Sequence, residues 1–440
     1  PASAGSSLPP LWDADAAVVH AEVERSGARA VLVNVWATWC VPSTADEAGR
    51  QLALKRFDRA RFERGLRKKL QSRANTWGTR FPGDEARSAA CETVGLREIE
   101  SCADLGVDAL AIDDGWQVPM AGGHPVTEAG DWTPHPERFT DGWKTIRQAA
   151  DAAGVELVLW MPGQSVTEQQ MAANLESGGF TGFKLDFLGL WARRDLDALL
   201  QKVEKVVERF DPPPVISWDV TENHPRLGYF FGREFGSLHT SNRKPGYDKR
   251  IRVNHVAYTP RLVLRDAWHL ARYVNLNQIE IPIQDPSALD LTLSDASLHS
   301  AAYCTAIALA GMPLFFMETS TFSGAARDEV RTLLQIWRAQ REALTRCYRF
   351  PIGAEPCGAA WTGFQLHDPE TRSGFVLAFR ERECPDPETE LGLHFLDEAT
   401  VEWHDLLSGE PSTTRGGSLR LHIPEAPGFR WMAYRGLPSA

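Results

Sequence analysis

The sequence predicts an α/β protein, a (β/α)8 TIM barrel followed by a small C-terminal antiparallel β domain. Two observations carry this prediction. From about residue 74 to residue 346, short apolar runs alternate with stretches of helical hydrophobic period, as in parallel strands covered by helices. Beyond Arg349 the helical period ends, and short apolar runs are separated by Gly, Pro and Asp. A chain of 440 residues is long enough for a barrel and a second domain.

Residues 1–50 are predicted to form an N-terminal extension that resembles a fragment of thioredoxin. An apolar run over residues 30–35 continues as WATWCVPS, residues 36–43, and thioredoxin-like proteins end their first strand in a similar WATWCxPC. Ser43 stands where those proteins carry their second cysteine. Because disulfide exchange needs both thiols, we favour a leftover or appended structural element, and a redox function resting on Cys40 is the third hypothesis for this chain.

Residues 55–69 are strongly basic, with the sequence KRFDRARFERGLRKK. A nucleic-acid contact is one interpretation. However, Phe57, Phe62 and Leu66 fall at helical spacing, which predicts an amphipathic helix with a solvated basic face. We prefer the helix.

The barrel is predicted to span residues 51–354 and the C-terminal β-sandwich domain residues 355–440. The barrel strands are predicted at residues 74–78, 109–114, 155–160, 183–188, 215–220, 236–241, 278–283 and 312–317. Helices are predicted over residues 85–105, 142–153, 166–177, 193–209, 260–273, 295–309 and 325–346. The strands of the β domain are predicted at residues 374–379, 391–395, 400–403, 419–423 and 431–434.

Composition excludes several classes of protein. The net charge of −11 argues against nucleic acid or an anionic membrane as the main partner, and no apolar run approaches the roughly 18 residues of a membrane span. The N-terminus lacks the basic and apolar segments of a signal peptide. Seven scattered cysteines fit reduced thiols. We therefore expect a cytoplasmic protein that needs neither a membrane nor nucleic acid, with a homo-oligomer left open.

Acidic residues and tryptophans recur where the predicted barrel strands end. These residues are Trp77, Asp113, Asp114, Trp116, Trp160, Lys184, Asp186, Trp218, Asp219, Asp285 and Glu318. Active sites of such barrels lie at the carboxyl ends of the strands, and an indole face beside carboxylates suits a sugar. No phosphate-binding loop and no zinc-like histidine spacing accompany these residues. We expect a carbohydrate ligand, no cofactor and no metal.

Several motifs in order resemble the melibiase-type α-galactosidases of glycoside hydrolase family 36, clan D. They are NTWGTRFPGDE (75–85), LAIDDGWQ (110–117), DWTPHPERFTDGWKTI (131–146), AGVELVLWMP (153–162) and GFKLDF (182–187). The resemblance runs from about Gln51 to the C-terminus. The large N-terminal β-sandwich usual in that family has no counterpart here, so the chain reads as truncated or chimeric at its start.

The resemblance implies a retaining glycosidase that forms a covalent glycosyl intermediate on Asp186. Lys184, two residues earlier on the same strand, shares its face and favours the ionised carboxylate. The residues predicted to contact the sugar are Trp77, Asp113, Asp114, Trp116, Trp160, Lys184 and Trp218. The resemblance implies terminal α-linked galactose, or a related α-glycoside, as the substrate.

The acid/base of such an enzyme is the uncertain residue. The family carries an aspartate in a T-S-D motif at the sixth strand, where this chain has Asn242, which cannot supply a proton. Asp219 is the first candidate for a substitute, and Glu222 and Glu234 are others. If none replaces it, the chain is a carbohydrate-binding pseudoenzyme, which is the alternative hypothesis.

Overall fold

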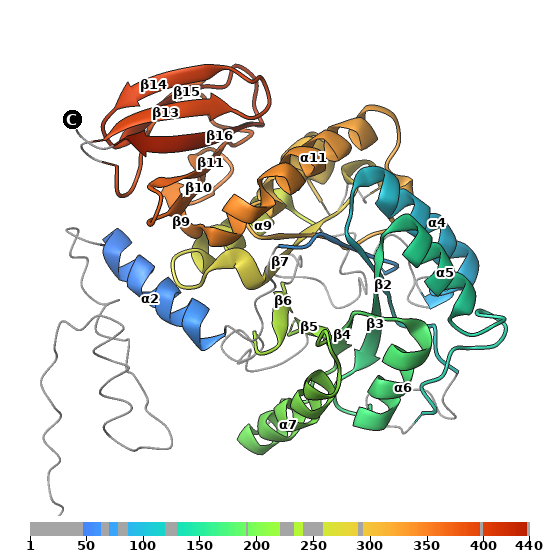
Figure 1. Ribbon diagram of the computed structural model, residues 1–440. Coiled ribbons are helices and arrows are strands. Elements are labelled where there is room, and N and C mark those ends of the chain that lie inside the picture. The colour runs from blue at the N-terminus through green and yellow to red at the C-terminus, as the bar shows by residue number, and fades with distance from the viewer. Residues whose placement is uncertain are drawn as a thin grey trace, which may run out of the picture.

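A closed barrel of eight parallel strands, with an antiparallel β domain beside it, forms the protein, as the sequence predicts (Figure 1). The computed structural model describes residues 47–62, 70–77, 87–118, 130–190, 192–220, 233–240, 258–288, 294–396 and 399–437. The predicted thioredoxin-like segment, up to residue 46, lies outside the described residues.

The barrel strands follow one another in chain order, and β1 closes the ring by pairing with β8. They are β1 Arg73–Asn75, β2 Ala109–Ile112, β3 Glu156–Pro162, β4 Gly182–Asp186, β5 Val215–Asp219, β6 Gly236–His239, β7 Ile279–Ile283 and β8 Met312–Phe315. All eight predicted strands are confirmed, with ends that differ by at most three residues.

Helices pack around the barrel. They are α2 Glu47–Arg61, α4 Glu92–Leu105, α5 Lys144–Ala153, α6 Glu168–Gly178, α7 Arg193–Arg209, α9 Pro260–Leu270, α10 Ala301–Ala308 and α11 Gly324–Arg346, with short 3-10 turns η3 Leu276–Gln278, η4 Pro286–Ala288, η5 Ala296–Leu298 and η6 Thr319–Thr321. The predicted helix over residues 295–309 is divided, because Ser300 caps α10 by accepting a hydrogen bond from the Tyr303 amide.

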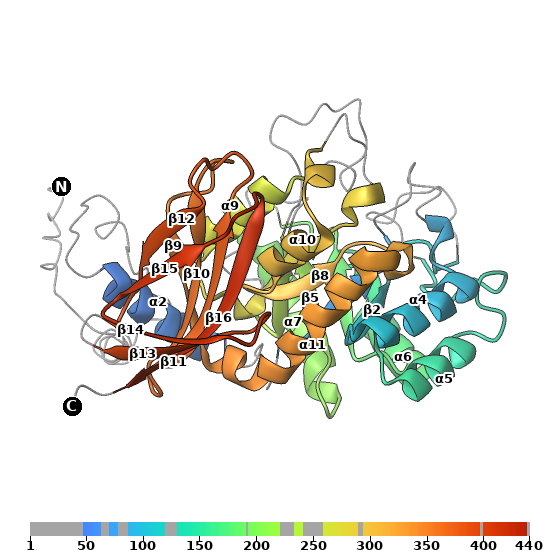
Figure 2. The ribbon, with the colours of Figure 1, turned by 90° about the horizontal axis from the view of Figure 1, so that it is seen from above.

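The β domain contains a six-stranded sheet of order β14-β13-β16-β11-β10-β9 and a two-stranded sheet β12-β15 (Figure 2). Its strands are β9 Tyr348–Gly353, β10 Trp361–Asp368, β11 Ser373–Arg380, β12 Glu388–Gly392, β13 Thr400–Asp405, β14 Pro411–Arg415, β15 Ser418–His422 and β16 Gly428–Leu437. The sequence analysis missed β9, β10 and β14. Since β9 pairs with β10, the sheet begins at Tyr348, before the expected boundary at residue 355.

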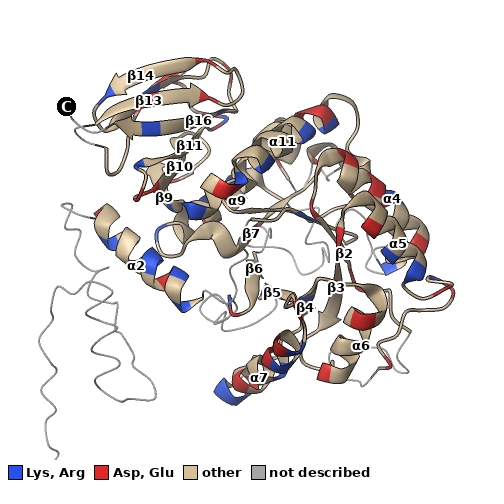
Figure 3. Cartoon of the chain, in the orientation of Figure 1, with Lys and Arg blue, Asp and Glu red and all other residues tan. Residues whose placement is uncertain are grey.

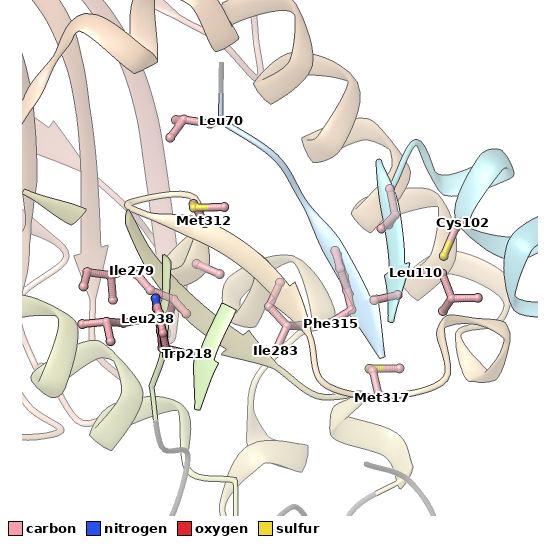
Figure 4. Close-up of a cluster of buried hydrophobic side chains, with 14 of the residues drawn as sticks. Leu70, Cys102, Leu110, Trp218, Leu238, Ile279, Ile283, Met312, Phe315 and Met317 are labelled. Carbon is pink, nitrogen blue, oxygen red and sulfur yellow. The ribbon is translucent and has the colours of Figure 1, made fainter. Parts of the chain in front are cut away.

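The main core lies between the barrel strands and the surrounding helices. Figure 4 shows Leu110, Trp218, Leu238, Ile279 and Phe315 in this cluster of buried apolar side chains. Residues of opposite parity on the same strands face the barrel interior, because side chains alternate along a strand. A small separate cluster of Ala109, Ala111 and Val158 contributes part of that interior.

Helix α2 packs with a face that the apolar pattern does not predict. Phe57 is 43% exposed, whereas the Lys55 side chain is fully buried, with its ammonium 4.7 Å from the centre of the Phe350 ring. Arg59 donates to backbone carbonyls at the end of α11. The prediction that Phe57 belongs to the buried face is wrong, because the helix docks through polar and cationic contacts with the β domain and α11. Phe62, from the same predicted face, is buried, and Leu66 lies outside the described residues.

The outer helices carry both signs of charge. Figure 3 shows acidic and basic residues interspersed along α7 and α11. Some form pairs one helical turn apart, such as Arg193 with Asp197 at 2.7 Å. None of the described helices is long and apolar enough to span a bilayer.

Replacing Lys55 with Met should remove a pH dependence of stability. Burial lowers the pKa of Lys55 from 10.5 to about 7. The unfolded chain therefore binds one more proton than the folded chain between these two pH values, and the free energy of unfolding rises with pH by up to about 1.4 kcal/mol per unit. The measurement is unfolding in urea at pH 7, 8 and 9. At pH 7 the variant should have a larger free energy of unfolding than the wild type, and this free energy should change less with pH.

The matched control is Lys205→Met, since the Lys205 side chain is 67% exposed on α7. If the free energy of unfolding changed equally with pH in the wild type and in Lys55→Met, the lowered pKa of Lys55 would be contradicted.

Candidate active site

Strand register brings several polar side chains together at the carboxyl end of the barrel. Lys184 on β4 is in register with Ser217 on β5, and Asp219 on β5 is in register with His239 on β6. Because side chains alternate along a strand, Lys184 and Asp186 share one face, as do Ser217 and Asp219. The hydrogen bonds and ion pairs described below place these faces inside the barrel.

The Lys184 ammonium is the centre of the cluster. Its Nζ lies 2.9 Å from Asp113 Oδ2 and 3.5 Å from Asp219 Oδ2. The side chain is buried and lies 5.1 Å from the centre of the Phe316 ring. Burial alone would lower the pKa of Lys184, but the charges of Asp113, Asp219 and Asp186 outweigh it and raise that pKa above its ordinary value. The lysine therefore stays charged.

Asp186 ends β4 and is partly exposed. Trp160 Nε1 donates to its Oδ2 at 3.2 Å, and the Phe187 amide donates to its Oδ1 at 2.7 Å. Burial and the charge of Asp219 raise the pKa of Asp186 to about 8, while Lys184 and the two N–H donors oppose that rise. Phe187 has a φ of 45°, in the left-handed region, so the chain turns sharply directly after the carboxylate.

Asp113 and Asp114 have different partners. Asn75 Nδ2 donates to Asp113 Oδ2 at 2.7 Å, the same oxygen that contacts Lys184. Asp114 instead accepts from Arg87 Nε at 2.8 Å and from Gln117 Nε2 at 2.7 Å. The structure thus brings Asp113 into the Lys184 cluster, whereas the two Asp114 oxygens are bound by Gln117, in the turn that follows β2, and by Arg87, which precedes α4.

Gly115 makes that turn feasible. Its φ is 116°, and a Cβ there would lie 2.4 Å from the Arg87 carbonyl oxygen. Only glycine tolerates this conformation and this close approach. The glycine of the DDGW motif therefore shapes the backbone next to Asp113.

Two of the predicted sugar contacts belong to the core. Trp116 is fully buried, with its Nε1 donating to the Trp160 carbonyl at 2.9 Å and its ring 5.3 Å from that of Trp143. Trp218 is 1% exposed and donates to the Glu234 carbonyl at 2.7 Å. Since Ser217 and Asp219 face the interior, Trp218 between them faces the helix layer, where Figure 4 shows it. Trp116 and Trp218 are therefore corrected from sugar contacts to core residues.

The other two predicted tryptophans remain at the carboxyl end of the barrel. Trp160 is almost fully buried and is joined to the cluster by its hydrogen bond to Asp186. Trp77 follows β1, is partly exposed, and donates its amide to Asn75 Oδ1 at 2.6 Å. These two indoles stay candidates for the pocket wall.

A polar network lies beneath the cluster, and the sequence analysis missed it. Glu280 on β7 accepts from Arg73 at 2.9 Å, from Ser217 Oγ at 2.8 Å and from Ser237. Burial raises the pKa of Glu280. These partners and His239 lower that pKa by a larger amount, so the net shift is downward. The signal in the sequence is a pair of polar residues two apart on one strand, as in Ser217 with Asp219 and Ser237 with His239.

His239 lies between the network and the cluster. Its Nδ1 is 4.0 Å from Glu280 Oε2, and its ring is 4.9 Å from that of Phe316. Burial lowers the pKa of His239 despite the nearby carboxylates. The imidazole is therefore neutral at neutral pH.

The candidate acid/base residues are distributed as follows. Asp219 is buried in the cluster. Glu234 precedes β6, at the opposite end of the strand from His239, and pairs with Arg61 of α2. Asn242 and Glu222 lie outside the described residues. Asp285 accepts from the amide and hydroxyl of Ser287, which makes it a turn residue.

Glu318 is buried and lies 3.5 Å from Arg97. Across the described part of the chain, no three His, Cys, Asp or Glu side chains converge as metal ligands would.

Comparisons with known proteins support the fold through structure alone. No protein-family model matches the chain. No curated protein matches it. Among solved structures, a variant of the GH36 α-galactosidase AgaA from Geobacillus stearothermophilus, in complex with 1-deoxygalactonojirimycin, has a TM-score of 0.64 at 12% identity and covers 88% of this chain and 59% of its own.

Two further solved structures agree. The α-galactosidase from Lactobacillus brevis has a TM-score of 0.63 at 13% identity, covering 90% of this chain and 59% of its own. α-Galactosidase I from Mortierella vinacea has a TM-score of 0.58 at 13% identity, covering 84% of this chain and 98% of its own. At these identities the likeness establishes the fold. The chain spans about three fifths of the length of the first of these proteins.

Replacing Glu280 with Gln should destabilise the barrel by about 3–5 kcal/mol, because the buried Arg73 guanidinium then loses the negative charge that faces it. The urea midpoint of unfolding measures this loss. Glu402→Gln, at an exposed position on β13, is the matched control and should leave the midpoint unchanged. An unchanged midpoint in the Glu280 variant would show that the network does not hold the barrel together.

Proposed function

We propose that this protein is a retaining glycoside hydrolase that cleaves terminal α-linked galactose, or a related α-glycoside, through a covalent intermediate on Asp186. The observation that carries the proposal is the cluster of Asp113, Asp186 and Asp219 around the Lys184 ammonium at the carboxyl ends of the barrel strands. The fold likeness supports it, since the similar structures are titled α-galactosidases, and variants of one are complexed with raffinose and stachyose.

Asp186 has the contacts that a nucleophile requires. The Phe187 amide fixes one oxygen and the Trp160 indole N–H contacts the other, so the carboxylate is held in a single orientation. One carboxylate oxygen attacks the anomeric carbon, a new C–O bond forms, and the glycosidic C–O bond breaks with its electrons going to the leaving oxygen. The Lys184 charge favours the ionised form of Asp186.

Asp219 is the acid/base in this proposal. It occupies the strand next to Asp186, and neighbouring strands lie about 4.8 Å apart. A retaining mechanism needs roughly 5–5.5 Å between its two carboxyl groups, which side chains on adjacent strands can reach. Asp219 gives its proton to the leaving oxygen, then takes a proton from the water that attacks the intermediate and releases Asp186.

One shared proton explains how the two carboxyls take different roles. The charge of Asp219 raises the pKa of Asp186, so protonating Asp219 removes that repulsion and lets Asp186 ionise. The two N–H donors on Asp186 favour its ionised form further. With its pKa raised to about 8, Asp186 holds this proton in the resting protein at neutral pH, so in the proposed reaction the proton moves to Asp219 before Asp186 attacks.

The second candidate function is carbohydrate binding without hydrolysis. The observation that favours it is Asn242, which stands where the resemblance expects the proton donor. Such a protein would keep the Asp113 and Lys184 contacts and would bind a sugar without turning it over.

Asp186→Ala should abolish release of nitrophenol from 4-nitrophenyl α-galactoside, because no intermediate can form. The leaving group departs with little acid assistance, so the assay tests the nucleophile alone. Asp151→Ala, on the surface of α5, is the control and should retain wild-type rates. If nitrophenol is released from a different α-glycoside instead, the proposed mechanism stands and the substrate is that other sugar. If folded wild-type protein releases nitrophenol from no α-glycoside, the enzyme proposal fails and the binding protein remains.

Asp219→Ala should lower the rate of raffinose hydrolysis by about 10²–10⁴-fold. Formation of the glycosyl-enzyme intermediate from the nitrophenyl substrate should be much less affected. Azide should then rescue this variant and yield an α-glycosyl azide, because azide replaces water in the second displacement. With Asp186→Ala, azide should yield the β-glycosyl azide from a single displacement. Equal losses on both substrates, or no rescue of Asp219→Ala, would remove Asp219 from the acid/base role.

A further inference from the structure

A second polar cavity, of about 250 Å³, lies between the barrel and the β domain. Its barrel side comes from the start of α9, η5 and the start of α10, and its other side comes from the residues before β10 and after β11. Figure 2 shows α9 and α10 next to the β domain. Its lining residues differ from those of the Lys184 cluster, so the cavity is distinct from the candidate active site.

The barrel side presents two aromatic rings. Tyr303 and His299 have ring centroids 5.1 Å apart, and Tyr303 is 2% exposed. An edge contact with Phe379 at 5.4 Å holds the Tyr303 ring in place. Tyr303 also lines the cavity, where its hydroxyl can both donate and accept a hydrogen bond.

Asp295 supplies an unsatisfied polar group to the cavity. Its Oδ1 is buried and has no hydrogen-bond partner among the described residues. Its backbone carbonyl lies 3.1 Å from His299 Nδ1, and since a carbonyl only accepts, that nitrogen carries a proton. Burial lowers the pKa of His299, so the ring is neutral and its Nε2 is an acceptor. A ligand rich in hydroxyl donors would satisfy both groups.

The opposite wall is preorganised. Glu381 Oε2 accepts from the amides of Cys357, Gly358 and Ala360 at 2.8–2.9 Å. Arg261 of α9 donates to the Cys357 carbonyl at 3.2 Å, which ties this loop to the barrel. The loop is therefore held in place by four hydrogen bonds, and the cavity does not depend on its rearrangement.

We propose that this cavity is a second carbohydrate site, which binds one neutral monosaccharide. The His299 ring would cover part of the C–H face of the sugar, while Asp295 and the Tyr303 hydroxyl would bind its hydroxyls. Acidic and basic side chains both line the cavity, which favours an uncharged ligand. The volume lies below the range of about 300–1,000 Å³ typical of drug-sized ligands, so a single ring is the expected occupant.

Ligand binding in this cavity can be measured through the reactivity of Cys357, an exposed free cysteine that lines it. Alkylation of Cys357 by iodoacetamide is followed by peptide mass spectrometry at increasing galactose concentration. At a concentration about ten times the dissociation constant, alkylation should slow about tenfold, because only the unliganded fraction reacts. Alkylation of Cys91, on α4's N-terminal side, should not change and serves as an internal control.

Two conservative variants test the assigned contacts. Asp295→Asn and Tyr303→Phe should each weaken protection of Cys357, and the double variant should lose it. Neither should alter hydrolysis, since neither residue lies in the Lys184 cluster. Absence of saturable protection in the wild type, or equal protection by glycerol at the same concentration, would overturn the proposal. So would undiminished protection in the double variant.

The same assay separates this proposal from the proposed function. Asp186→Ala should keep full protection of Cys357, because its substitution does not touch this cavity. Protection in a protein that hydrolyses no α-glycoside would leave the second site standing and the glycosidase proposal rejected. Hydrolysis of an α-glycoside without protection of Cys357 would support the glycosidase proposal and reject the second site.

Discussion

The buried ammonium of Lys184 is the interaction on which the candidate site depends. Asp113 and Asp219 contact it directly, and Asp186 feels its charge from two residues along the same strand. Three carboxyl groups this close would repel one another, and a lysine this buried would lose its proton without them. Each charge is therefore tolerated because of the others, and together they define the polar end of an otherwise apolar barrel.

The barrel architecture supplies what this cluster needs underneath. Glu280 and Arg73 form a second ion pair in the interior, and the hydroxyls of Ser217 and Ser237 complete the hydrogen bonding of the glutamate. The opposite faces of the same strands carry large apolar residues that pack against the helices. One barrel thus combines a polar interior with an apolar outer layer, and the alternation of side chains along each strand keeps the two apart.

The β domain is joined to the barrel through polar contacts as well as apolar ones. Lys55 and Arg59 of α2 reach β9 and the end of α11, and Arg261 reaches the loop before β10. The proposed second carbohydrate site lies within this junction. Its ligand would touch both domains, so binding there would favour their docked arrangement.

The sequence by itself predicted the barrel, the β domain and four residues of the cluster, Asp113, Lys184, Asp186 and Asp219. These predictions depended on local signals: alternating apolar runs, strand ends and short motifs. The strands β9 and β10 were missed, because β10 is buried along its whole length and lacks the clear apolar run that marks its neighbours. The role of Asp219 as acid/base was a hypothesis from the sequence, and it stays a proposal.

Tertiary structure decided which side of each strand a residue faces and which distant residues meet. Trp218 stands beside Asp219 in the sequence, yet it lies in the core, because neighbours along a strand point in opposite directions. Trp116 lies in the core because the turn after β2 places it there, with its indole N–H donating to the Trp160 carbonyl. The ion pair of Arg73 with Glu280 joins residues 207 positions apart, which only the closure of β1 against β8 brings near. Composition and residue spacing predict the helices and strands. Barrel closure and strand register determine which distant residues contact one another, and the chemistry of the site depends on those contacts.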